Sequence, residues 1–351
     1  MNTPVTSAAP GPLAHTKKQV DGDWPQWIAE NRLRNCTPDS MLATMVANGL
    51  DREACAHAIA HVETDPAYLA ARKHQQLQRK LESVLANLQK LWESDSAYAQ
   101  VDKRAAPSAD EFIARYVRGC RPVVLTDMAR DWPAMRRWSP QDLKARFGHL
   151  EVEIQADRNA DPHYEENKLE HRQMSKLGEF VDRVLAGGPT NDYYMTANNE
   201  ALRQPGFAPL LADIGTLPAF CDASQLGRLS SFWFGPAGTL TPLHHDTLML
   251  FHTQVVGRKR WRFISPLETP KLYNHSGVFS PIDIDRPDLA RYPLFAHAKV
   301  LEVVVEPGET VFLPLGWWHQ VTSLDVSLSF SFSNLAAPNQ FEYDNPSIHN
   351  W

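Results

Sequence analysis

"TPLHHD", residues 241–246, places two histidines and an aspartate next to one another. Side chains along a β-strand alternate between its two faces, so His244 and Asp246 share one face while His245 lies on the other. We therefore predict that His244 and Asp246 bind one metal ion together and that His245 packs away from it. If the strand continues unbroken, His252 shares the face of His244 as well.

A third histidine, His319, stands much later in the chain, in "PLGWWHQV", residues 314–321. The segment before it, "ETVFLP", is predicted to be a strand. In an antiparallel barrel, this part of the chain can return beside the first strand and bring His319 opposite His244 and Asp246. Two imidazoles and one carboxylate on one side of a metal form the facial triad of non-haem Fe(II) oxygenases, whereas zinc prefers four tetrahedral ligands, often with cysteine. A His-x-Asp pair is common by chance, so the interpretation depends on the surrounding sequence.

Residues 104–351 are predicted to form one mainly β domain. After a capped helix near residue 109 come short strands separated by Gly and Pro, a pattern typical of a sandwich or barrel. The candidate strands include "PVVLTD" (122–127), "LEVEIQ" (150–155), "DYYMTA" (192–197), "SFWFGP" (231–236), "LMLFHTQVVG" (248–257), "RWRFISP" (260–266), "VLEVVVEPGETVFLP" (300–314) and "VSLSFSFSN" (326–334). The stretch "TQVVGRKRWRFISP", residues 253–266, reads as a hairpin that turns at Gly257.

Lys259 is predicted to point into the barrel, because it shares a strand face with Trp261 and Phe263. An unpaired buried charge is expensive, and this hairpin offers no acid, so a dicarboxylate ligand could supply the counter-charge. The alternative is a surface lysine whose ammonium reaches solvent. In "VSLSFSFSN", Asn334 continues the alternation of the apolar residues, which suggests a polar contact at the end of the pocket.

The first hundred residues have a different character. Residues 1–20 are rich in Pro, Ala, Thr and Ser, which predicts a disordered tail. Residues 21–103 are predicted to form a helical domain for docking or dimerisation, in which Thr37 and Asp51 cap helices and Gly49 ends one. A long helix is expected from Pro66 to about Ser94.

An apolar stripe with alternating spacings of four and three residues marks this long helix. It consists of Leu77, Leu81, Val84, Leu88 and Leu91. Such spacing favours packing of one helix on another, although about two heptads are fewer than a coiled coil usually shows. The stripe either packs within its own chain or forms the interface of a homodimer, and we predict the homodimer.

Composition narrows the class of protein. The net charge of −6 disfavours nucleic acid as a partner. No apolar run approaches the roughly 20 residues that cross a bilayer, and the N-terminus has no hydrophobic signal core, so we expect a cytoplasmic protein. The four cysteines form no CxxC pair, which speaks against disulfides and a zinc site.

Several motifs together resemble the cupin-type JmjC hydroxylases, and most of all the asparaginyl hydroxylase that acts on hypoxia-inducible factor. They are residues 112–134, 241–261, 280–295, 304–321 and 327–334, which occur in the order of that family. The resemblance covers about residues 108–335. It implies a double-stranded β-helix that binds Fe(II) and 2-oxoglutarate and uses O₂.

The resemblance also implies a role for individual residues. His244, Asp246 and His319 match the iron ligands. Lys259 and Thr241 match the groups that bind the distal carboxylate of 2-oxoglutarate, Asn334 matches an amide on the co-substrate side, and Tyr194 matches a tyrosine donor for which Tyr193 is the rival. Leu250 stands where relatives often carry Asn, and His252 where an aromatic residue is common, so the inner carboxylate is expected to be held differently.

The implied function is a 2-oxoglutarate-dependent dioxygenase that hydroxylates a C–H bond, first of all on an amino-acid side chain of a protein or peptide. Three alternatives stay open. They are hydroxylation of a free small molecule, demethylation of N-methyl-lysine, and a metal-binding cupin without turnover.

Overall fold

The computed structural model describes residues 20–275 and 277–344, which fall into two compact units that divide between Asn87 and Leu88. This division lies within the long helix, earlier in the chain than the expected boundary at residue 104. Of the predicted disordered tail, residues 1–20, all but Val20 lie outside the described residues.

Three short helices and the start of a fourth build the first unit. They are α1 (Trp24–Leu33), α2 (Pro38–Ala47), α3 (Arg52–Val62) and α4 (Pro66–Glu93). The predicted caps are confirmed: the Thr37 hydroxyl accepts from a backbone N–H of α2, the Asp51 carboxylate does the same for α3, and Gly49 adopts a positive φ of 84°. Their buried faces meet in a small core of Trp24, Trp27, Ile28, Cys36, Met41, Met45, Leu50, Cys55 and Ile59.

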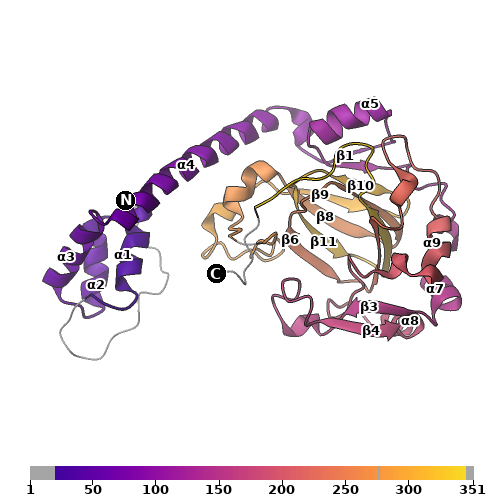
Figure 1. Cartoon of the computed structure of the whole chain (residues 1–351), viewed down its shortest axis with the longest axis horizontal. Coiled ribbons are helices and arrows are strands. Elements are labelled where there is room, and N and C mark those ends of the chain that lie inside the picture. The colour runs from indigo at the N-terminus through magenta and orange to yellow at the C-terminus, as the bar shows by residue number, and fades with distance from the viewer. Residues whose placement is uncertain (1–19, 276, 345–351) are drawn as a thin grey trace. The chain divides into compact units, whose positions relative to one another are not determined.

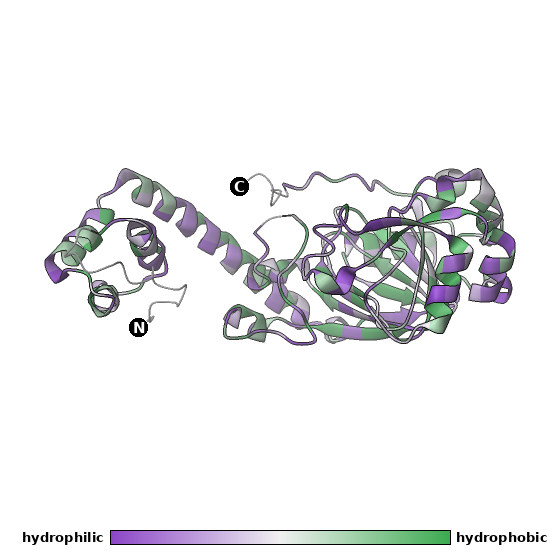
Figure 2. Cartoon of the chain, turned by 90° about the horizontal axis from the view of Figure 1, so that it is seen from below, coloured by the Kyte–Doolittle hydropathy of each residue, from purple (hydrophilic) through white to green (hydrophobic). Residues whose placement is uncertain are grey.

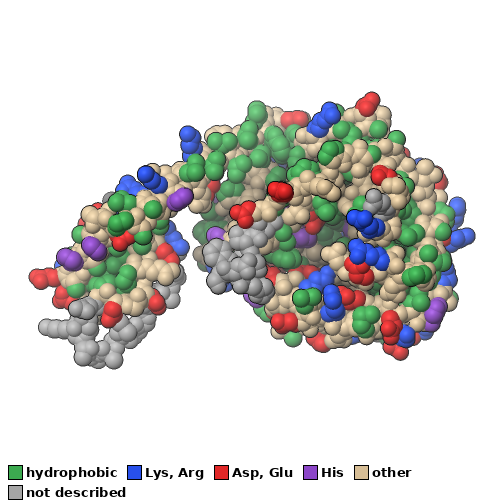
Figure 3. Space-filling view, in the orientation of Figure 1, with side chains coloured by type: hydrophobic (Ala, Val, Ile, Leu, Met, Phe, Trp, Pro, Cys, Tyr) green, Lys and Arg blue, Asp and Glu red, His purple; other side chains and the backbone are tan. Residues whose placement is uncertain are grey.

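The apolar stripe of α4 is exposed. The side chains of Leu77, Leu81, Val84, Leu88 and Leu91 are 42–65% accessible. Figure 3 shows apolar side chains on the visible surface of this helix. The described residues therefore do not bury the stripe. An exposed apolar stripe of this kind marks an interaction surface.

We expect the stripe to form a homodimer contact, which Leu81→Glu combined with Leu88→Glu should break. At a two-fold contact the double substitution would bring four like charges together in an apolar interface, so the protein should become monomeric. Light scattering at micromolar concentration measures the mass. The matched control is Leu169→Glu with Leu289→Glu, two exposed leucines outside the stripe. A monomeric wild-type protein would contradict the prediction.

Two β-sheets face each other in the second unit (Figure 1). A six-stranded sheet has the order β1-β2-β10-β7-β12-β5, and a four-stranded sheet has the order β6-β11-β8-β9. Side chains from both sheets, among them Val124, Val311, Trp261 and Phe263, pack together between them. This arrangement is the jelly roll that was predicted from the sequence.

The strands are β1 (Asp102–Arg104), β2 (Val123–Leu125), β3 (Glu151–Gln155), β4 (Arg172–Lys176), β5 (Ser230–Gly235), β6 (Leu240–His244), β7 (Leu250–Val256), β8 (Lys259–Ile264), β9 (Leu301–Val305), β10 (Thr310–Leu313), β11 (Trp318–Ser323) and β12 (Ser327–Phe332). The helices are α5 (Ala109–Phe112), the π-helix Ile113–Arg118, α6 (Ala134–Arg137), α7 (Pro140–Phe147), α8 (Leu177–Ala186) and α9 (Ala208–Ala212). Short 3-10 helices lie at Ser96–Tyr98, Arg158–Ala160, Ala201–Arg203, Pro205–Phe207, Ala223–Gln225, Pro266–Lys271 and Pro293–His297.

The outer face of the six-stranded sheet is apolar because helices cover it. Phe251 and Phe312 from the sheet join Phe112, Leu143 and Phe180 from the helices in the largest core of the protein. Figure 2 shows the strands of this unit largely in the colour of hydrophobic residues. None of the described helices combines the length and apolar character that a membrane span requires.

Two predicted elements differ from the structure. The expected hairpin at Gly257 is wrong, because β7 belongs to the six-stranded sheet and β8 to the four-stranded sheet. Gly257, at a φ of 70°, is where the chain crosses between them, and a Cβ there would lie 2.2 Å from the carbonyl oxygen of Val326. The expected strand at 192–197 consists only of isolated bridges, in which Tyr194 pairs with Gln155 and Met195 with Phe234.

Candidate metal centre

Pairing between β6 and β11 brings the distant histidines together. The two strands are antiparallel, and His319 stands opposite His244 in their register. Asp246 follows just after β6 ends, in the loop that leads to β7. The strand does not continue unbroken to His252, because β6 and β7 lie in different sheets, so the condition for His252 to share the face of His244 is not met. His252 nevertheless faces the same cavity as His244.

The ligand atoms of His244, Asp246 and His319 lie within 4.8 Å of one another. Nε2 of His319 is 3.7 Å from Oδ2 of Asp246. A hydrogen bond from Nδ1 orients each histidine ring. Nδ1 of His244 donates to the carbonyl of Pro242 at 2.8 Å, and Nδ1 of His319 donates to the carbonyl of Trp317 at 3.1 Å. A carbonyl only accepts, so each Nδ1 carries the proton and each Nε2 offers a lone pair to the shared site.

His245 takes no part in this cluster, as the alternation of side chains predicts. Its ring is buried, packs edge-on against Trp318 at a centroid distance of 4.8 Å and lies beside Tyr343 at 5.2 Å. Burial lowers the pKa of His245, which favours a neutral packing residue.

The triad opens into a cavity of about 380 Å³. Thr241, Leu250, His252, Lys259 and Trp261 line its walls. Besides Asp246 and Lys259, the charged residues of the lining are Glu200, Arg203 and Arg228.

Lys259 is buried within this unit, as the sequence predicts, at 1% accessibility. Its Nζ donates to the Tyr194 hydroxyl at 3.0 Å and to Ser329 Oγ at 2.9 Å, and lies 3.3 Å from Nε2 of His252. No carboxylate of the described residues pairs with it. Burial lowers the pKa of Lys259 to about 7, so a bound anion would favour the charged form at neutral pH.

The arginines that alternate with Lys259 point the other way. Arg258 pairs with Asp325 at 2.8 Å, and Arg260 pairs with Asp285 at 2.8 Å. Both pair with acids outside the cavity, whereas Lys259 has no acidic partner among the described residues.

The structure distinguishes the two candidate tyrosines. The Tyr194 hydroxyl meets Lys259, while the Tyr193 hydroxyl donates to the carbonyl of Arg183 at 3.3 Å. Asn334 is buried but is not part of the cavity lining, and its Oδ1 has no partner among the described residues.

Sequence reasoning missed the serines of β12 because it assigned the apolar face of this strand to the pocket. Leu328 and Phe330 instead pack in the core beneath the helices. The opposite face points inward, where Ser329 receives a hydrogen bond from Lys259 and Ser331 receives one from Trp233 Nε1 at 2.7 Å. The repeating Ser-x-Ser pattern was the signal that could have identified them.

The donor set fits a metal of the non-haem iron type. Two imidazoles and one carboxylate on one side leave further coordination positions open, and no cysteine takes part. The buried ammonium nearby, without an acid of its own, fits a dicarboxylate co-substrate.

Comparison with known proteins agrees with this geometry. A family model described as a cupin-like domain matches residues 108–336, about two thirds of the chain. Lysine-specific demethylase 8 of Xenopus tropicalis is 31% identical over 239 residues, which covers 66% of this chain and 52% of the relative. Lysine-specific demethylase JMJ30 of Arabidopsis thaliana is 33% identical over 244 residues, which covers 66% and 54%.

A further relative, HSPB1-associated protein 1 of Homo sapiens, is 31% identical over 225 residues, which covers 58% of this chain and 46% of the relative. The chain thus spans about half the length of these relatives. They support the JmjC type expected from the sequence, without singling out the asparaginyl hydroxylase within it. With the jelly roll, the triad and the matched region in agreement, the chain belongs to the cupin-like domain family, in its JmjC branch.

Proposed function

We propose that the chain is an Fe(II)- and 2-oxoglutarate-dependent oxygenase that hydroxylates a C–H bond on an amino-acid side chain of a protein or peptide. One observation carries this proposal. The two-histidine, one-carboxylate cluster and a buried lysine without an acidic partner in the described chain line the same cavity.

Different residues around the cavity bind the co-substrate and the metal. Lys259 binds the distal carboxylate of 2-oxoglutarate, with Tyr194 and Ser329 orienting its ammonium and Thr241 as a further hydroxyl donor. The triad would hold the metal ion. When bound, iron and 2-oxoglutarate supply the activation of O₂ and the oxidation of the substrate C–H bond, with release of succinate and CO₂.

Charge near the cavity favours hydroxylation over demethylation of N-methyl-lysine. Arg203 and Arg228 line the cavity, and Glu200 is already paired with Arg203 at 2.6 Å. Because Glu200 and Arg203 neutralise each other, a cationic methylated lysine would meet the remaining guanidinium of Arg228, so neutral or anionic side chains are better suited. Demethylation is the second candidate, because two of the relatives are named lysine-specific demethylases. A free amino-acid-like molecule is the third.

Mass spectrometry can test the proposal and separate its alternatives. Anaerobic addition of 2-oxoglutarate to the Fe(II)-loaded protein should first produce a weak visible charge-transfer band. The same protein in air, mixed with peptides from a cell lysate, should form succinate and increase the mass of a peptide by one oxygen atom. Loss of a methylene from a methylated lysine would favour the demethylase. A protein that binds metal but gives neither band nor succinate would be a cupin without turnover.

A further inference from the structure

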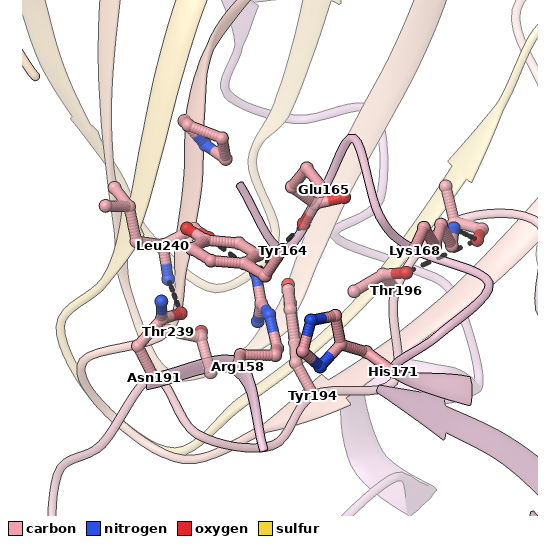
Figure 4. A network of polar contacts seen from close by, with 12 residues as sticks. Arg158, Tyr164, Glu165, Lys168, His171, Asn191, Tyr194, Thr196, Thr239 and Leu240 are labelled. Carbon is pink, nitrogen blue, oxygen red and sulfur yellow. Dashed lines mark hydrogen bonds and ion pairs between the residues drawn. The ribbon is translucent and has the colours of Figure 1, made fainter. Parts of the chain in front are cut away.

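We propose that Arg158 is a positioning residue for the co-substrate pocket: it clamps the start of β6 and the ring of Tyr194, so that Thr241 keeps its place in the cavity wall and the Tyr194 hydroxyl keeps its place beside Lys259. The inference rests on the proposed function, because it concerns the binding of 2-oxoglutarate. Figure 4 shows Arg158 beside the ring of Tyr164, with Leu240 and Tyr194 close by.

Arg158 is a fully buried cation outside the cavity lining. Its side chain is 0% accessible, and Nη2 donates both to Oε1 of Glu165 at 2.9 Å and to the carbonyl of Leu240 at 2.9 Å. Its Nε and Nη1 have no hydrogen-bond partner among the described residues. Burying a guanidinium with two unpaired nitrogens is unfavourable, and an apolar residue would fill the same space without that penalty. We therefore infer that the contacts of the guanidinium, and not its bulk, are the reason for an arginine at this position.

Three side chains converge on Leu240. Besides the bond from Arg158, the Tyr164 hydroxyl donates to the Leu240 carbonyl at 3.0 Å, and the Leu240 N–H donates to Oδ1 of Asn191 at 2.8 Å. Leu240 is the first residue of β6, and Thr241 follows it directly. Fixing both backbone groups of Leu240 thus fixes the direction in which Thr241 enters the cavity.

The same guanidinium supports Tyr194. Its central carbon lies 4.2 Å from the ring centroid of Tyr164 and 5.5 Å from that of Tyr194. Arginine stacks on aromatic faces in this way, with electrostatic attraction to the ring. The Tyr194 hydroxyl in turn accepts from Lys259 at 3.0 Å. One arginine therefore connects with Thr241 through Leu240 and with Lys259 through Tyr194.

The test is the affinity for 2-oxoglutarate with Mn(II) in place of iron, followed by quenching of tryptophan fluorescence, so that no turnover is needed. Arg158→Met should weaken 2-oxoglutarate binding by about tenfold, the lower end of the effect of residues that orient binding groups. Affinity for Mn(II) alone, measured from the EPR signal of free Mn(II), should stay within about twofold of wild type, since the triad does not contact Arg158. Arg158→Lys should recover only part of the loss, because a lysine can donate to Leu240 but cannot stack as a plane.

Two further variants keep the test decisive. Tyr164→Phe removes only the hydroxyl that donates to Leu240, and should weaken 2-oxoglutarate about twofold to tenfold even if Arg158→Met fails to fold. Arg183→Met is the matched control, because Arg183 stacks at 4.0 Å on Tyr193, the neighbouring tyrosine that does not meet Lys259. It should leave 2-oxoglutarate binding unchanged.

The outcomes separate this proposal from the proposed function. A wild-type protein that does not bind 2-oxoglutarate would overturn both. Wild-type binding together with unchanged affinity in Arg158→Met and Tyr164→Phe would overturn only the role of Arg158. Equal losses of 2-oxoglutarate and Mn(II) affinity in a variant with a lowered melting temperature would make Arg158 a structural residue and overturn its positioning role as well.

Discussion

His319→Ala and His244→Ala are each expected to abolish tight metal binding, and with it all turnover. Each substitution removes one of the three side chains whose ligand atoms cluster within 4.8 Å. The remaining two cannot form a facial triad, and neither His245 nor His252, the imidazoles closest by in the fold, belongs to the cluster among the described residues. Titration calorimetry with Mn(II) or Fe(II) under anaerobic conditions measures the loss.

His245→Ala is the control for this prediction, because it removes an imidazole from the same short stretch of chain. The His245 ring packs against Trp318 and Tyr343, so its loss should lower stability but leave metal affinity close to wild type. The register of β6 with β11 would be incorrect if His245→Ala lost the metal while His244→Ala kept it.

Lys259→Ala is expected to raise the requirement for 2-oxoglutarate without removing the metal. A charge-assisted hydrogen bond typically contributes about 1.5–3 kcal/mol, which corresponds to roughly tenfold to a hundredfold in affinity. The Kd of 2-oxoglutarate in the Mn(II) protein and its KM in turnover should rise together. Arg258→Ala is the control, because Arg258 pairs with Asp325 outside the cavity. Unchanged affinity in Lys259→Ala would mean that the anion binds elsewhere.

The pKa of Lys259 adds a pH dependence to this prediction. Burial lowers that pKa to about 7, so at pH 8 the side chain is mostly neutral before the co-substrate binds. A bound carboxylate favours the ammonium, so binding at pH 8 should take up a proton, and affinity should fall as the pH rises above about 7. Calorimetry in two buffers of different ionisation enthalpy detects the proton. In Lys259→Ala this uptake should disappear.

The alternation of side chains along a strand was enough to predict the direction of several site residues. His244, the last residue of β6, faces the metal cluster and His245 faces away from it, and Lys259 points inward with Trp261 while Arg258 points outward. Helix caps were equally local, because the Thr37 and Asp51 side chains bond to backbone groups within three residues. Side-chain alternation in strands and capping of the free N–H groups at a helix start both depend on a few neighbouring residues, so both can be predicted from a short stretch of sequence.

Three features depended on contacts that the sequence does not encode locally. Gly257 reads as a hairpin turn, but whether the strands on each side pair or separate into two sheets depends on the strands that come later. Ser329 points inward and meets Lys259 because helices bury the opposite face of β12, and alternation alone cannot say which face is covered. Arg158, some 80 residues before β6, carries no motif that links it to Leu240.

The sequence by itself therefore determined the jelly-roll class, the three candidate metal ligands and the inward lysine, because strand alternation and the order of the motifs express them. Only the tertiary structure decided how these residues are supported. It brought His319 opposite His244 through the pairing of β11 with β6, placed Asp246 in the loop beyond the strand, and surrounded Lys259 with Tyr194, Ser329 and His252. The physical reason is that burial and hydrogen bonding are satisfied between segments far apart in the chain, so the partner of each polar group is known only when both sheets have closed around the cavity.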